Sequence, residues 1–326
     1  MRVFPVRVRF IVTGVLSALS MIAVAESPDQ SASQPRNLIP EALWDASLSE
    51  NEIVTRVRNF DILQNAMADW DQSMSRQLAM KGQADLAADR EAMMRRRYAQ
   101  IERAWREVIN RYPNNARAVN YFGEVMYDHA GDQVEGLRMW KLAESLDGKL
   151  SEPKNNLALY YLDNGDYEQG IRYLDAALKL DPDNADYLYN VSQIYMIHWP
   201  QVQEVKKWDE ARVYKEAMEA SKKAMTLKPH DFSLIEDHAL NYFAAERFNI
   251  TPDWAEAAGM WQTARSLAYE SDQTFNSWLN EARCWIRASE FAKAESCLQE
   301  AAKIMPDSDA IRALLERARS GGQTQG

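Results

Sequence analysis

The 326-residue sequence is poor in residues that interrupt helices, with only 12 glycines and 11 prolines. So few breakers leave room for long helices and argue against an all-β fold, which needs frequent turns. What is present is 46% hydrophobic and includes 10 tryptophans and 14 tyrosines, enough to bury a large core. The length exceeds that of one compact helical bundle and suits a short solenoid, whose core grows repeat by repeat.

An excess of positive charge is also missing. The formal net charge is −10, and removing the three arginines of residues 1–25 takes the remainder to −13. Such an acidic chain repels phosphate backbones, so we expect no nucleic-acid partner. The tight basic run Arg95-Arg96-Arg97 has glutamates on either side, which is typical of a solvated helix face.

Long apolar runs are confined to the N-terminus. After three early arginines, residues 10–25 are uncharged and mostly apolar, and they end in Ala23-Val24-Ala25. This pattern predicts a cleaved signal peptide over 1–25 and a periplasmic or secreted protein, with an uncleaved anchor as the alternative. Residues 26–48 form a polar linker, and we expect no membrane span after signal removal.

Residues 151–184 have the pattern of a helical hairpin. Apolar side chains recur at helical spacing in two groups, Leu157, Tyr160 and Tyr161, then Ile171, Leu174 and Leu178. Between them, Asn164-Gly165-Asp166 is a turn signal, and Pro182 cannot continue the second helix. Ala158 and Gly170 are small where the two backbones must approach each other.

This segment resembles the 34-residue tetratricopeptide repeat (TPR), whose defining positions are here Ala158, Gly170, Leu174, Ala177 and Pro182. The same frame recurs over 116–150, 151–184, 185–231, 232–271 and 275–308, with insertions in the third and fourth repeats. The resemblance implies an all-α fold, a right-handed α–α superhelix over 116–319. A capping helix over 309–319 would close this solenoid, and a disordered tail over 320–326 would follow.

Residues 49–115 have a different pattern. Ser49 and Glu52 have the spacing of a capping box, which predicts a helix start. Apolar residues then recur every seven positions in three series: Ile53, Phe60, Met67 and Met74; Met94, Ile101 and Val108; Tyr98, Trp105 and Tyr112. We therefore expect two long antiparallel helices packed by a heptad-like seam. This hairpin would cap the solenoid near Gly123; the alternative is a dimerisation arm, giving a homodimer through the hairpin.

The sequence offers no catalytic constellation. Its four histidines, His129, His198, His230 and His238, match no metal-binding spacing, and we place His129 on the surface. Glycine-rich phosphate loops and nucleophile elbows are missing too, so we expect no enzyme, cofactor or metal. The two cysteines, Cys284 and Cys297, both fall in the last repeat and form either a disulfide or two buried thiols.

The TPR resemblance also implies a concave groove, lined by fixed positions of each repeat's first helix. Carried over, these positions give the candidates Asn120, Glu124, Tyr127, Asn155, Tyr189, Gln193, Phe243, Arg283 and Arg287. The resulting groove is acidic at its start, aromatic in the middle and basic at its end. Of the residues by which some family members clamp a C-terminal carboxylate, only Asn156 is matched, so we do not expect that clamp.

We therefore expect an exported scaffold or adaptor that binds proteins through its concave groove, in cell-envelope assembly. The partner would be a peptide segment or helix with apolar anchors. The alternative is a glycan- or peptidoglycan-binding protein that uses Trp199, Trp208 and Trp254 from the two insertions as platforms. The other interpretation of these tryptophans, which we favour, is that they only wedge neighbouring repeats together.

Overall fold

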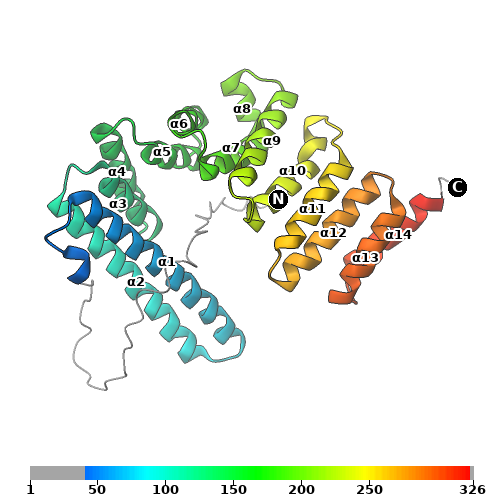
Figure 1. The fold of residues 1–326 in the computed structure, drawn as a ribbon, viewed down its shortest axis with the longest axis horizontal. Helices are drawn as coiled ribbons and strands as arrows, with labels where there is room; N and C mark the ends of the chain where they lie inside the picture. Colours follow the sequence, from blue (N-terminus) through cyan, green and yellow to red (C-terminus); the bar gives the residue numbers. More distant parts are fainter. Residues whose placement is uncertain (1–40, 324–326) are drawn as a thin grey trace. The chain divides into compact units, whose positions relative to one another are not determined.

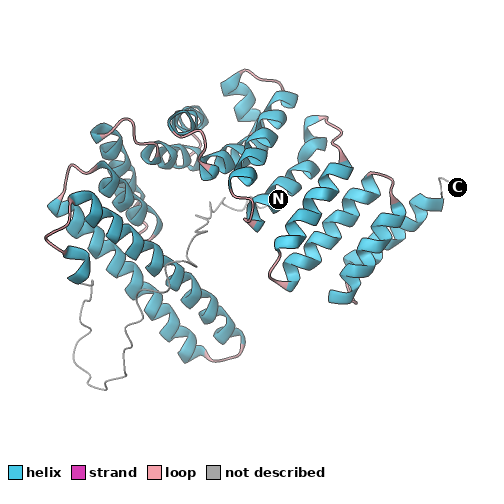
Figure 2. Ribbon diagram, in the orientation of Figure 1, coloured by secondary structure: helices cyan, strands magenta, loops and turns pink. Residues whose placement is uncertain are grey.

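A computed structural model describes residues 41–323. The predicted signal peptide, most of the predicted linker and the last three residues of the predicted tail lie outside this range. Every regular element between residues 41 and 323 is a helix (Figure 2). The all-α prediction is therefore confirmed. Along the same stretch, no helix combines the length and apolar character that crossing a membrane requires.

Fourteen α-helices and two 3-10 helices make up residues 41–323, and most form antiparallel pairs (Figure 1). In chain order they are η1 (Glu41–Trp44), α1 (Glu50–Met80), α2 (Ala84–Arg111), α3 (Ala116–Asp128), α4 (Gln133–Leu146), α5 (Glu152–Asp163), α6 (Tyr167–Leu180), α7 (Ala185–Ile197), α8 (Trp199–Lys206), α9 (Glu210–Leu227), α10 (Phe232–Ala244), η2 (Ala245–Phe248), α11 (Trp254–Leu267), α12 (Ser271–Arg287), α13 (Phe291–Ile304) and α14 (Asp309–Gln323). They divide into two compact units, up to Leu157 and from Ala158 onward.

The first unit contains the expected N-terminal hairpin, formed by α1 and α2. The predicted capping box is present, since Ser49 and Glu52 bond each other's backbone N–H groups. The base of the hairpin packs on α3 in one apolar cluster that includes Val57, Trp105 and Phe122. Burying this base against the first repeat is the role expected of a cap.

The expected heptad seam is wrong toward the tip of the hairpin. Met67 belongs to the predicted seam, yet its side chain is 39% exposed. The buried positions there are small or polar, and they include Ala68, Asp71 and Ala87. Asp71 accepts hydrogen bonds from two arginines of α2, at 2.8 and 3.3 Å, so an ion-pair network replaces apolar packing between the distal halves of the helices.

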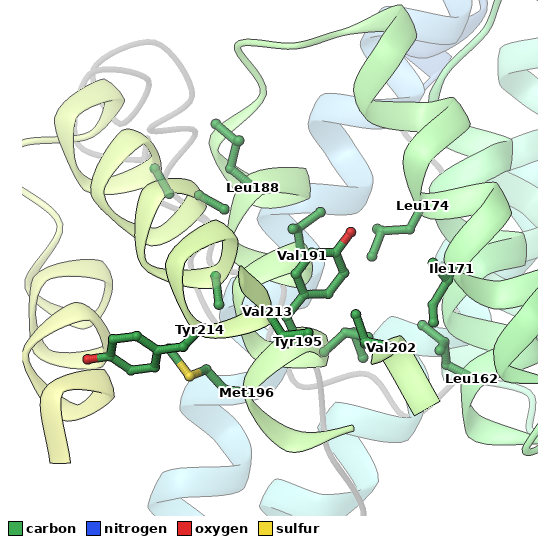
Figure 3. Close-up of a cluster of buried hydrophobic side chains, with 14 of the residues drawn as sticks. Leu162, Ile171, Leu174, Leu188, Val191, Tyr195, Met196, Val202, Val213 and Tyr214 are labelled. Carbon is green, nitrogen blue, oxygen red and sulfur yellow. The ribbon is translucent and has the colours of Figure 1, made fainter. Parts of the chain in front are cut away.

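The second unit is built around the cluster drawn in Figure 3. Ile171 and Leu174 of α6 pack there with Val191 and Tyr195 of α7. The expected close approach of the helices at Gly170 is confirmed, since a Cβ there would lie 2.5 Å from Leu162 Cγ. The same cluster takes in Val202 of α8, so the helix inserted into the third repeat belongs to the core.

The two insertions also contact each other. Trp199 of α8 meets Phe248 of η2 edge to face, with ring centroids 5.7 Å apart. Lys206 at the end of α8 forms an ion pair with Asp175 of α6. At the other end of the unit, α14 covers α12 and α13 with Ile311 and continues to Gln323, past the expected end at residue 319. These contacts stabilise the packing between neighbouring helical pairs of the second unit.

Candidate functional site

The candidate groove residues fall in both compact units. Four of them, Asn120, Glu124, Tyr127 and Asn155, belong to the first unit, on α3 and α5. The other five, Tyr189, Gln193, Phe243, Arg283 and Arg287, belong to the second unit, on α7, α10 and α12.

In the first unit, two candidates belong to a buried polar network. Asn120 has no exposed surface and donates a hydrogen bond to Glu124 Oε1 at 2.9 Å. The Asn156 amide donates to both of them, at 3.0 and 3.1 Å. On the other side, Arg58 of α1 brings Nη1 within 3.1 Å of Glu124 Oε2. Asn120 and Glu124 therefore bind their own neighbours.

Burial dominates the electrostatics of this network. It raises the pKa of Glu124, while the Arg58 guanidinium and the Asn156 amide pull it back down. Arg58 also bonds Asp61, whose Oδ2 accepts a further hydrogen bond from Trp105 Nε1 at 3.1 Å. Removing one partner would leave a buried charge uncompensated, which is costly. The network is thus a connection between the hairpin and the first repeat.

The remaining two candidates of the first unit are held by packing. The Tyr127 ring lies 5.1 Å from that of Trp140 on α4, and Asn155 is buried. The first unit therefore offers a partner little of the surface that the groove pattern predicted. His129, expected on the surface, is instead half-buried against Tyr98, with ring centroids 4.3 Å apart, so that expectation is wrong.

In the second unit, the structure brings two candidates together. The Arg287 guanidinium lies over the Phe243 ring at 5.3 Å and over the Trp254 ring at 4.9 Å. Its Nε is also 3.4 Å from Glu246 Oε1. Both aromatic rings remain half-buried. Arg287 therefore joins α12 to α10 and α11 and leaves its cluster partly open to solvent.

The other candidates of this unit extend that cluster into a face. Tyr189 and Gln193 lie one turn apart on α7, and the next turn ends in Ile197, which is 45% exposed. On α10 the position that corresponds to Gln193 holds Leu240, which is 42% exposed. Arg283 on α12 is exposed and donates to Asn280 at 2.8 Å. We call the surface of Tyr189, Gln193, Ile197, Leu240, Phe243, Arg283 and Arg287 the α7–α10–α12 face.

Ile197 was not among the residues that the TPR resemblance singled out. It follows Gln193 by four residues, so the helical period could have placed it on the same face. It closes α7 immediately before the insertion, where the repeat pattern breaks off. Without the structure, an apolar residue at such a junction is indistinguishable from one that packs under the inserted helix.

The tryptophans of the insertions are engaged by neighbouring side chains. Trp208 packs edge to face on Tyr195, and the Arg212 guanidinium lies over its ring at 4.5 Å. Trp199 packs on Phe248, and Trp254 lies beneath Arg287. A sugar platform needs an open aromatic face, whereas these three rings are half-buried. Their packing favours the wedge interpretation over the glycan-binding alternative.

Residues expected to carry no chemistry also have defined surroundings. His238 is buried with its Nδ1 3.0 Å from Ser221 Oγ, and burial lowers its pKa to about 4. Cys284 and Cys297 are buried free thiols, and burial raises the pKa of each to about 12. Between residues 41 and 323, His, Cys, Asp and Glu side chains nowhere gather in threes that could hold a metal ion.

Comparison with known proteins agrees with this architecture. The tetratricopeptide repeat family matches residues 155–222. Photosystem I assembly protein Ycf3 of Acaryochloris marina is 30% identical over 83 residues, which make up 25% of this chain and 50% of that protein. The match thus spans only half the length of that relative.

Two solved structures have a similar arrangement of helices. One is YrrB, described as a TPR protein with an unusual peptide-binding site: it is 15% identical, the alignment covers 65% of this chain and 97% of that one, and the TM-score is 0.49. The other, pilF of Pseudomonas aeruginosa, is 15% identical, with 77% and 97% covered and a TM-score of 0.47. Nothing about function follows from likenesses this distant. The tetratricopeptide repeat model thus matches this chain over residues 155–222, and the helices of the structure stack in pairs as such repeats do.

Proposed function

We propose that the chain is a protein-interaction scaffold that holds a segment of its partner on the α7–α10–α12 face. The observation that carries this proposal is the exposure of Ile197 and Leu240 on neighbouring first helices. Large apolar side chains at the centre of a partly polar surface are typical anchors for a binding partner. The family's general role in protein binding supports the same conclusion.

The charges of the face indicate the chemistry of the partner. Arg283 and Arg287 lie at its α12 end. Glu236 and Asp237 lie beside the face on α10, where Asp237 accepts a hydrogen bond from Tyr189. Burial, together with the adjacent Asp237 carboxylate, raises the pKa of Glu236. An acidic residue of the partner would be favoured near the arginines and a basic one near α10. The partner segment would then carry apolar anchors with opposite charges on either side.

We further propose that this scaffold is exported and acts in cell-envelope assembly. Support comes from the signal-peptide pattern of residues 1–25 and its Ala23-Val24-Ala25 ending. N-terminal sequencing of the protein purified from its natural host tests the export step. A mature chain that begins at Glu26 is expected, and a chain that retains residues 1–25 would contradict cleavage.

Binding at the face is tested by crosslinking capture from an envelope extract, with Leu240→Asp as the variant. The charge would sit at the centre of the face and should abolish capture of the partner. Val134→Asp is the matched control, because Val134 is 77% exposed on α4 and belongs to the first unit, whereas the face belongs to the second. Equal capture by both variants and the unaltered chain would show that the partner binds elsewhere.

A homodimer through the N-terminal hairpin stays a prediction. Met67 and Trp70 are exposed on α1, and Trp70 is 52% accessible with Arg90 over its ring. Sedimentation of the mature chain decides the question when Trp70→Glu is compared with the unaltered protein. A dimer that the substitution dissociates is expected, and a concentration-independent monomer would end the idea.

A further inference from the structure

A small cavity lies between α1 and α3 in the first unit. Its volume is about 130 Å³, and its lining residues are Asn51, Val54, Thr55, Arg58, Asn59, Arg117 and Tyr121. The five residues from α1 are spaced i, i+3, i+4, i+7 and i+8, and the two from α3 are one turn apart, so each helix contributes one face. This cavity shares no residue with the α7–α10–α12 face, which belongs to the second unit.

The lining is rich in hydrogen-bond donors and contains no acid. Six of the seven side chains carry N–H or O–H groups, and none is a carboxylate, although the chain holds 48 aspartates and glutamates. An uncharged or acidic cavity would be the expectation for a surface of this protein. A donor-lined cavity suits a ligand group that only accepts hydrogen bonds.

Some N–H groups of Arg58 are available to a ligand. Its contacts with Asp61 and Glu124 are both made by Nη1, at 2.9 and 3.1 Å. A guanidinium has five N–H donors, and among residues 41–323 its Nε and Nη2 make no hydrogen bond or ion pair. The group is held in place by the Tyr121 ring, whose centroid is 4.3 Å from Arg58 Cζ. Arg58 is therefore oriented before any ligand arrives.

The Thr55 hydroxyl already donates to the Asn51 carbonyl oxygen at 2.8 Å, but three other lining residues have donors available. Arg117 is exposed and forms no ion pair with the described residues. The Asn51 side-chain oxygen accepts from Asn115 at 3.5 Å, which leaves the Asn51 amide N–H groups available. Burial raises the pKa of Tyr121, so its hydroxyl stays protonated at neutral pH and can donate.

We propose that this cavity binds a single carboxylate group through Arg58, Arg117 and Tyr121. Pockets that enclose a whole small molecule measure roughly 300–1,000 Å³, so this cavity has room for one functional group of a ligand. Asp61 and Glu124 behind Arg58 balance the two arginines. A monoanionic carboxylate therefore suits the site better than a phosphate dianion, which those two acids would repel more strongly.

The hydrogen-bond donors of this cavity are not the residues that line the concave groove of TPR proteins. Five of the lining residues come from α1, a helix of the N-terminal hairpin outside the predicted repeats. The carboxylate could belong to a small acid, to the end of a chain or to an acidic side chain. A lone carboxylate held by a few hydrogen bonds should bind with a millimolar dissociation constant.

Acetate titration of the mature chain tests the proposal, with the arginine Nε–H signals followed by NMR at pH 7 and constant ionic strength. Saturable shifts of the Arg58 and Arg117 signals are expected, and acetamide should cause none. Arg117→Gln should weaken acetate binding about tenfold, as expected for one charge-assisted hydrogen bond. Arg56→Gln is the matched control, since Arg56 is exposed on α1 outside the cavity lining.

Two capped dipeptides distinguish the sources. A peptide with a free C-terminal carboxylate and one with an aspartate and an amidated end are each titrated beside a neutral peptide. If the first peptide binds more strongly, the ligand is a chain end, and if the second does, it is an acidic side chain. Binding of acetate without binding of either peptide indicates a small acid. Linear shifts without saturation, equal shifts with acetamide, or unchanged affinity in Arg117→Gln would overturn the proposal.

Discussion

At the scale of single residues, Gly170 gives the sharpest prediction. A Cβ at this position would lie 2.5 Å from Leu162 Cγ and 3.1 Å from the Ala158 carbonyl oxygen. Gly170→Ala should therefore force the α5–α6 pair apart and lower the free energy of unfolding by about 1–3 kcal/mol. Urea denaturation followed by circular dichroism measures the change.

Gly259 supplies the control for this experiment. It lies inside α11, and a Cβ built there meets nothing within 4 Å. Gly259→Ala should raise the free energy of unfolding by roughly 0.5–1 kcal/mol, because alanine favours the helix. Stabilisation by both substitutions would show that helix propensity rather than close packing governs the two positions. Destabilisation by both would show that the close approach at Gly170 is not what distinguishes them.

His238 gives a prediction for pH. Burial lowers its folded pKa to about 4 from an ordinary value of 6.5. Between these values the unfolded chain binds a proton that the folded chain does not, so stability falls as the pH drops from 6.5 toward 4. The full loss from this group is about 3 kcal/mol, and below pH 4 it contributes no further change.

An NMR titration of the His238 ring, with unfolding measured from pH 7 to 4, tests this prediction. In His238→Gln the slope of stability against pH should be shallower, since the replacement does not titrate. His230→Gln is the control substitution, because His230 is exposed on the turn before α10. A ring pKa near 6.5 in the folded protein would contradict the prediction.

The sequence predicted a residue's environment correctly where the reason for the residue is local, as with a small side chain at a helix contact. Small residues at Ala158 and Gly170 indicated a close helix approach, and the structure confirms it. Asn120 and Glu124 occupy groove positions of the TPR pattern but are bound by Arg58 and Asn156. That outcome depends on a side chain about 60 positions away on α1, which no local pattern reveals.

At the scale of elements, helical periodicity located the helices but not which face each one buries. The heptad positions of α1 predicted a Met67 seam, yet Asp71 and Ala68 face α2 toward the tip. A charged residue with two arginine partners can be buried as fully as an apolar one. A hydrophobicity pattern predicts burial only for apolar residues, so it does not reveal a buried Asp71. The sequence likewise did not predict that the inserted α8 belongs to the core, where Val202 packs in the apolar cluster.

At the scale of the molecule, stacked pairs should unfold locally. Asp71→Asn removes the buried charge that Arg90 and Arg97 bond at 3.3 and 2.8 Å, and it should weaken the hairpin by about 1–3 kcal/mol. In repeat proteins each pair is stabilised by itself and its neighbours. Amide hydrogen exchange should therefore speed up in α1 and α2 and stay unchanged in α12 and α13.

Asp69→Asn makes the same charge change at an exposed position two residues away, so it separates burial from net charge. We expect its exchange pattern to match that of the unaltered chain. Exchange that accelerates equally in all helices of Asp71→Asn would mean that the chain unfolds as one cooperative body. A local response would instead allow the α7–α10–α12 face to keep its geometry while the hairpin opens, because α12 is packed by α11, α13 and α14.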